Sequence, residues 1–64
     1  MSELEDKLQI ALANVETAKA MILLKKENNK DDEINSYLTN YNLELLDVKL
    51  RLKDMIRTLP KIGE

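Results

Sequence analysis

A chain of 64 residues predicts one small domain, and its composition excludes several ways of stabilising it. Because it contains neither cysteine nor histidine, it can form no disulfide, and neither a zinc site nor the usual catalytic triads and dyads can be assembled. We therefore expect no catalytic residue, no metal site and no cofactor. The net charge of −2 gives no electrostatic reason to expect nucleic acid. An RNA-binding bundle would need a basic face, whereas charges of both signs alternate along this chain.

A capping signal marks the start of a first helix. The hydroxyl of Ser2 can accept a hydrogen bond from a first-turn amide, while Glu5 can reach back to the amide of the cap. We predict a helix from about residue 3 to about residue 27. Its apolar stripe repeats at intervals of four and three residues and consists of Leu4, Leu8, Ala11, Val15, Ala18 and Ile22.

A polar stretch from Lys25 to Glu33 interrupts this stripe, and the heptad phase slips by two residues across it. Asparagines at 28 and 29 tolerate left-handed turn conformations, and Asp31 or Asp32 can cap a second helix. We place a tight turn at about residues 28–31. The alternative is one long helix in a dimer, which no glycine in the stretch forbids. The acids could attract a divalent cation, but without a loop of liganding oxygens we interpret them as a cap.

The second helix is predicted from about residue 32 to about residue 58, because Pro60 disfavours helical geometry at the preceding residue. Residues 59–64 form the expected C-terminal tail, which we predict to be loose from Pro60 to Glu64, with docking of Ile62 on the hairpin as the alternative. The stripe of this helix is a sustained heptad. It has leucine at the a positions (Leu38, Leu45, Leu52, Leu59), and Ile34, Tyr41, Val48 and Met55 at the d positions.

These elements predict an all-α fold, an antiparallel two-helix hairpin of coiled-coil type. Folding the chain at the turn pairs positions whose numbers add up to about 60. Val15 then faces Leu45, and Leu8 faces Leu52. The alanines of the first stripe oppose large residues of the second, as close packing requires.

Each helix also carries a second set of apolar residues on the side away from its stripe. A chain this small rarely builds a core worth more than ~3–5 kcal/mol, so assembly is a common source of stability. We predict a small non-catalytic interaction module that forms a homo-oligomer (a dimer or tetramer) or docks on a partner protein. Scattered surface leucines are the alternative. The predicted partner-binding residues are Ile10, Ala13, Thr17, Ala20, Leu24, Leu43, Leu46 and Leu50.

The opening Leu4-Glu5-Asp6-Lys7-Leu8, within a short and slightly acidic hairpin, resembles the small two-helix co-chaperones of type III secretion needle subunits (YscE/SsaE type). The resemblance implies a protein that holds a partner chaperone and helps to keep the needle subunit from polymerising.

An enzymatic alternative comes from a second resemblance. Leu46-Asp47 is similar to the end of the Ser-x-x-Leu-Asp signature of small two-helix phosphatases that act on sporulation response regulators. Leu43 stands at the serine position, however, so a solvated helix charge is the favoured interpretation of Asp47.

The sequence predicts no membrane span. The longest purely apolar run, from Ala20 to Leu24, is far too short for a span or for the core of a signal peptide. We expect a cytoplasmic, reducing compartment. The frequent asparagines indicate an AT-rich genome, such as that of a bacterium or phage.

Overall fold

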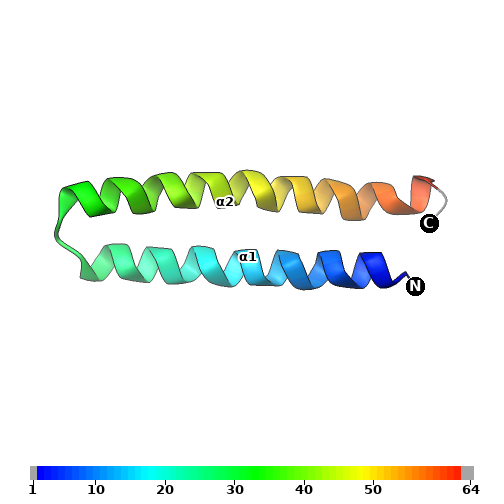
Figure 1. The fold of residues 1–64 in the computed structure, drawn as a ribbon, viewed down its shortest axis with the longest axis horizontal. Helices are drawn as coiled ribbons and strands as arrows, with labels where there is room; N and C mark the ends of the chain where they lie inside the picture. Colours follow the sequence, from blue (N-terminus) through cyan, green and yellow to red (C-terminus); the bar gives the residue numbers. More distant parts are fainter. Residues whose placement is uncertain (1, 63–64) are drawn as a thin grey trace.

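The computed structural model describes residues 2–62 and consists of two antiparallel helices (Figure 1). Helix α1 spans Glu3–Asn28, helix α2 spans Asp32–Thr58, and a short 3₁₀ helix, η1, spans Leu59–Ile62. The connection lies at one end of the molecule and both termini lie at the other. The predicted all-α hairpin is confirmed, and the alternative of one continuous helix is wrong.

Short polar side chains cap both helices. The Ser2 Oγ accepts a hydrogen bond of 2.9 Å from the amide of Glu5. At the second helix, Asp31 Oδ1 accepts from the amides of Glu33, at 2.9 Å, and Ile34, at 3.3 Å. Each cap satisfies amides that have no partner within the helix.

Two asparagines hold the turn together. Asn35 Nδ2 donates to the carbonyl oxygen of Asn29 at 2.9 Å, and Asn29 Nδ2 donates to Asn35 Oδ1 at 3.1 Å. Asn29 is extended, with φ −113° and ψ 131°, and Asn28 is helical, so neither takes the expected left-handed conformation. The extended residue carries the chain past the end of α1, and α2 begins beyond that end in Figure 1.

The C-terminal segment differs from the expected loose tail. Helix α2 ends at Thr58, and the chain then tightens into η1 instead of leaving the hairpin. Leu59, at the start of η1, is only 6% exposed. Its burial places the start of η1 against the hairpin, although Pro60 follows directly. Residues 63–64 of the predicted tail lie outside the described residues.

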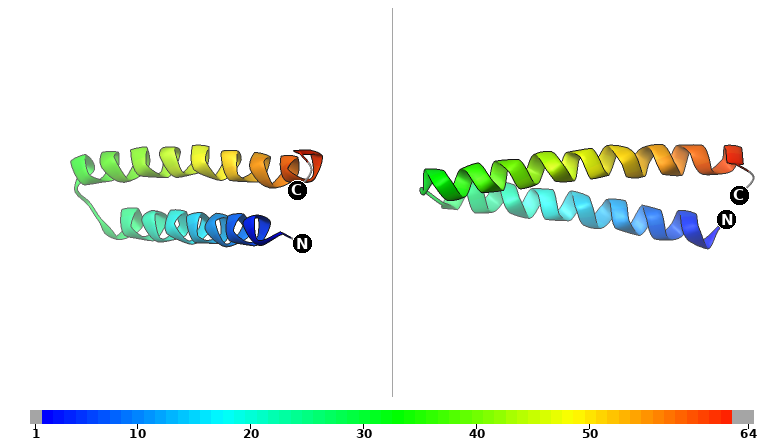
Figure 2. Two further views of the ribbon diagram at one scale, coloured as in Figure 1. Left: turned by 45° about the vertical axis from the view of Figure 1, so that its right-hand side comes forward. Right: turned by 45° about the horizontal axis from the view of Figure 1, so that its top comes forward.

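The hairpin is a single layer of helices. Its extents are 49 × 15 × 10 Å, and its radius of gyration is 14.9 Å, against about 11 Å for a compact chain of this length. In Figure 2 the helices stay side by side in both views, and within residues 2–62 no third element covers either broad side. Among residues 2–61, only Leu38 and Leu59 are buried. Globular domains ordinarily pack two layers around a core.

Candidate functional site

The helices meet along a set of positions that differs from the predicted one mainly in α2. In α2, the less exposed residues are the a-position leucines together with the residues at the e positions, one beyond each d position. In α1, the less exposed residues lie at the a, d and e positions, because Ala11 and Ala18 at the d positions are half-buried too. The inward residues are Leu8, Ala11, Leu12, Val15, Ala18, Lys19, Ile22 and Lys26 from α1, and Asn35, Leu38, Asn42, Leu45, Lys49, Leu52, Ile56 and Leu59 from α2.

The d positions of α2 are consequently not in the core, and that part of the predicted stripe is wrong. Ile34, Tyr41, Val48 and Met55 are between 41% and 50% exposed. In α1, Leu4 is likewise exposed. The asparagine pair at the turn explains the difference, because it holds the e-position residue Asn35 against the end of α1 and so fixes the rotation of α2.

The register of the hairpin also differs from the predicted one. The hydrogen bonds between Asn29 and Asn35 and the ion pair between Glu16 and Lys49 join residues whose numbers add up to 64 or 65. Val15 therefore lies level with Lys49 rather than with Leu45, a displacement of about one helical turn. The shift follows from the overhang of α2 beyond the end of α1.

The d positions of both helices lie on the same broad side of the hairpin. In an antiparallel pair that meets along a and e, the d positions of each helix are about 80° from the line joining the axes, and the opposite chain directions turn both toward one side. We call this side the apolar face. It consists of Ile34, Tyr41, Val48 and Met55 from α2 and of Leu4 and the half-buried Ala11 and Ala18 from α1, whose remaining d position is Lys25.

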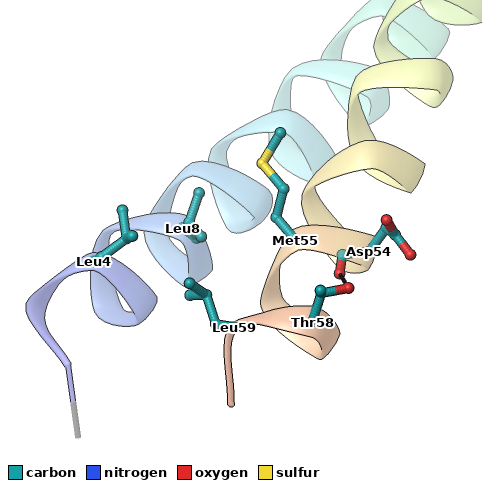
Figure 3. Close-up of a pocket in the computed structure, with 6 residues that line it drawn as sticks. All are labelled: Leu4, Leu8, Asp54, Met55, Thr58 and Leu59. Atoms are coloured by element: carbon teal, nitrogen blue, oxygen red, sulfur yellow. Dashed lines mark hydrogen bonds between the residues drawn. The ribbon is translucent and has the colours of Figure 1, made fainter. Parts of the chain in front are cut away.

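A pocket at the open end of the hairpin lies on this face (Figure 3). Its volume is about 300 Å³, and Leu4 and Met55, which are d residues of different helices, both line it. Leu8, Met55 and Leu59 project toward the space between the helices, whereas the carboxylate of Asp54 points away. The remaining lining residue, Thr58, donates its hydroxyl hydrogen to the carbonyl oxygen of Asp54 at 2.7 Å. Apart from Asp54 and Thr58, the pocket is therefore lined by apolar side chains.

Polar groups interrupt the contact between the helices. Lys49 Nζ lies 2.7 Å from Glu16 Oε1, and the side chains are 22% and 49% exposed, respectively. The hydrogen bond from Lys49 is the main cause that lowers the pKa of Glu16 below its ordinary value. Asn42 also lies on the inward side, where its Oδ1 is buried without a hydrogen-bond partner. These groups weaken the hairpin's own core relative to an all-apolar contact.

The eight residues predicted to bind a partner are all exposed. In α1, Thr17 donates its hydroxyl hydrogen to the carbonyl oxygen of Ala13 at 3.1 Å, so that hydroxyl is partly satisfied within the helix. The α1 set lies on the side of its helix away from α2, whereas Leu46 of the α2 set lies on the broad side opposite the apolar face. The d-position residues of α2, which the sequence assigned to the core, form an exposed apolar row on the apolar face. The heptad pattern of the sequence identifies these residues as apolar and periodic.

The candidate chemical groups are engaged in structural interactions. Asp31 caps α2, and Asp47 pairs with Arg51 at 3.1 Å on the exposed surface. Within residues 2–62 no group of three or more histidine, cysteine, aspartate or glutamate residues is placed to hold a metal ion. Of the helices in that range, none combines the length and the apolar character needed to cross a membrane.

Comparison with known proteins finds no family model, no curated protein and no solved structure that matches this chain.

Proposed function

We propose that this chain is a non-catalytic protein–protein interaction module, a helical hairpin that supplies one layer of a larger helical bundle. The observation that carries the proposal is the apolar face. Half of the second heptad, at Ile34, Tyr41, Val48 and Met55, is left on the surface by the way the helices pack. Contiguous apolar surface of this kind marks sites where proteins associate, whereas single exposed leucines do not.

The polar contact between the helices gives further support. A hairpin that brings lysine and asparagine to its inner side and isoleucine, valine and methionine to one outer side is poorly suited to stand alone. A second layer of helices against the apolar face would bury the d positions and complete the core. The proposed function is therefore the binding of other helices on the apolar face.

The test is a charge placed on the apolar face. Val48→Glu would put a carboxylate at the centre of the face without touching the inward residues. Asn40→Glu is the matched control, because Asn40 is exposed on the same helix and lies off the face. Leu50→Glu tests the outward residues predicted from the sequence. Sedimentation equilibrium reports the molar mass, and circular dichroism reports the helicity of each variant.

We expect the Val48→Glu variant to lose association while the Asn40→Glu variant keeps it. Burying an unpaired charge would weaken binding by at least about a hundredfold, since ~3 kcal/mol is a modest cost for such a group. If only the Leu50→Glu variant loses association, the binding surface is the outward set and the apolar face is ordinary surface. If no variant changes any association, the proposal is wrong.

A further inference from the structure

Building on the proposed function, we infer that the partner is a second copy of this chain. It packs on the apolar face with its turn over the open end of the first copy, so that α2 lies antiparallel to α2 of the second copy. The product is a two-layer, four-helix dimer. Three features support this occupant and orientation: the area that the hairpin leaves exposed, the charges along α2, and the place of the end pocket.

The exposed area matches what a dimer needs. The accessible surface of the chain is 5,090 Å². A compact monomer of 7.4 kDa would expose about 4,200 Å², so the hairpin exposes roughly 900 Å² more. A standard protein–protein interface takes about 800 Å² from each partner. One further hairpin of the same length on one broad side would therefore account for the excess.

The charges beside the face complement those of an antiparallel copy. Glu44 and Arg51 each precede an a-position leucine, so they lie along one edge of the apolar face, on either side of the middle of α2. When α2 packs antiparallel to its copy around Val48, Glu44 lies level with Arg51 of the second copy, and the reverse pair forms as well. Antiparallel coiled coils place oppositely charged residues in this way.

Both groups are available for these pairs. No ion pair within residues 2–62 engages Glu44. Arg51 contacts Asp47 through Nε, which leaves its terminal nitrogens to donate to another carboxylate.

The opposite orientation, turn against turn, lacks this complementarity. There α2 would lie against α1 of the second copy in the register seen within the hairpin. Glu44 would be level with Met21 and Arg51 with Asn14, and no ion pair would form. The apolar residues fit the turn-to-terminus orientation as well, because Tyr41 and Met55 lie at equal distances from Val48. An antiparallel copy therefore matches apolar residues with apolar residues along α2.

The end pocket gains an occupant in the same arrangement. Leu4, Leu8, Met55 and Leu59 line it at the open end, and the first turns of α2 of the second copy would lie above it. Tyr41, on the apolar face, is 50% exposed. In the register around Val48, the second copy would bring this side chain level with Met55 and over the pocket, and the twofold symmetry would fill both pockets of the dimer.

Charge reversal tests the inference. We would prepare Glu44→Arg, Arg51→Glu and the double variant, and measure molar mass by sedimentation equilibrium in low salt, with Val48→Glu and Asn40→Glu alongside. Wild type should have twice the mass of 7.4 kDa. Each single variant places like charges opposite each other twice, so its dimer should dissociate about tenfold more readily. An equimolar mixture of the single variants should form the mixed dimer, and the double variant should recover the homodimer. High salt should reduce these differences.

Each other outcome has a definite meaning. If the wild type stays monomeric, the inference that the partner is a second copy of this chain is wrong. If a partner protein is then bound by wild type and lost in Val48→Glu, the proposed function survives. If Val48→Glu dissociates the dimer but charge reversal does not weaken it, the chain dimerises through the apolar face, but not with α2 antiparallel to α2 of the second copy. A dimer that withstands Val48→Glu as well as charge reversal overturns both the inference and the proposed function.

Discussion

Lys49 Nζ lies 2.7 Å from Glu16 Oε1 and joins the middle of α2 to the middle of α1. The lysine stands at a heptad position that faces the other helix, so its aliphatic part packs inward while its ammonium reaches the glutamate at the edge. This pair gives the hairpin a specific rotation and register, because an apolar residue at the same position would have no fixed partner.

The stability of the hairpin should depend on pH through Glu16. The hydrogen bond from Lys49 lowers the pKa of Glu16 in the folded state. A depressed carboxylate pKa stabilises the fold fully above the unfolded value, which is about 4.5, and this contribution is lost as the pH falls through the folded pKa. Thermal melts between pH 7 and pH 2 should therefore show a loss that is absent in Glu16→Gln. If Glu16→Gln and wild type lose stability in parallel, Lys49 does not stabilise the glutamate in solution.

Leu38 should be the most costly leucine to truncate within α2. It is 8% exposed, whereas Leu45, predicted from the heptad to be central, is only half-buried. Leu38→Ala should cost about 2–3 kcal/mol, a large share of the stability of so small a domain. Leu45→Ala should cost less. Chemical denaturation of both variants at one protein concentration decides the order, and a larger loss for Leu45→Ala would contradict it.

The sequence was sufficient to predict where the helices begin and end. It was not sufficient to predict which side of α2 faces α1. Ser2, Asp31 and Pro60 mark the helix ends by local chemistry, and the a-position leucines do pack inward. The d and e positions, however, both follow an a position at spacings of three and four. Periodicity alone cannot tell whether Tyr41 or Asn42 faces the other helix. That choice depends on the hydrogen bonds of Asn29 and Asn35, which form only once the chain has turned.

The register can be checked by disulfide crosslinking. Leu12 and Leu52 are both inward residues, and they lie level when paired numbers add up to about 64. Leu12→Cys with Leu52→Cys should therefore crosslink within one chain faster than Leu8→Cys with Leu52→Cys, the pair expected from the sequence. A one-turn offset moves the second pair about 6 Å apart along the axis, which strains a disulfide. If Leu8→Cys with Leu52→Cys crosslinks faster, the register expected from the sequence is correct and the register described above is wrong.

Asn42 should be a site where an apolar substitution stabilises the protein. Its Oδ1 is buried against α1 without a hydrogen-bond partner, and such a group costs about 1–3 kcal/mol. Asn42→Leu removes the amide and adds an inward leucine between Leu38 and Leu45. A gain of 1 kcal/mol corresponds to roughly 4–8 °C in Tm for a domain of this size. Asn40→Leu, on the exposed side of the same helix, is the control and should leave Tm nearly unchanged. An equal rise in both variants would indicate a general effect of helix propensity, and a fall in Asn42→Leu alone would mean that the amide finds a partner in solution.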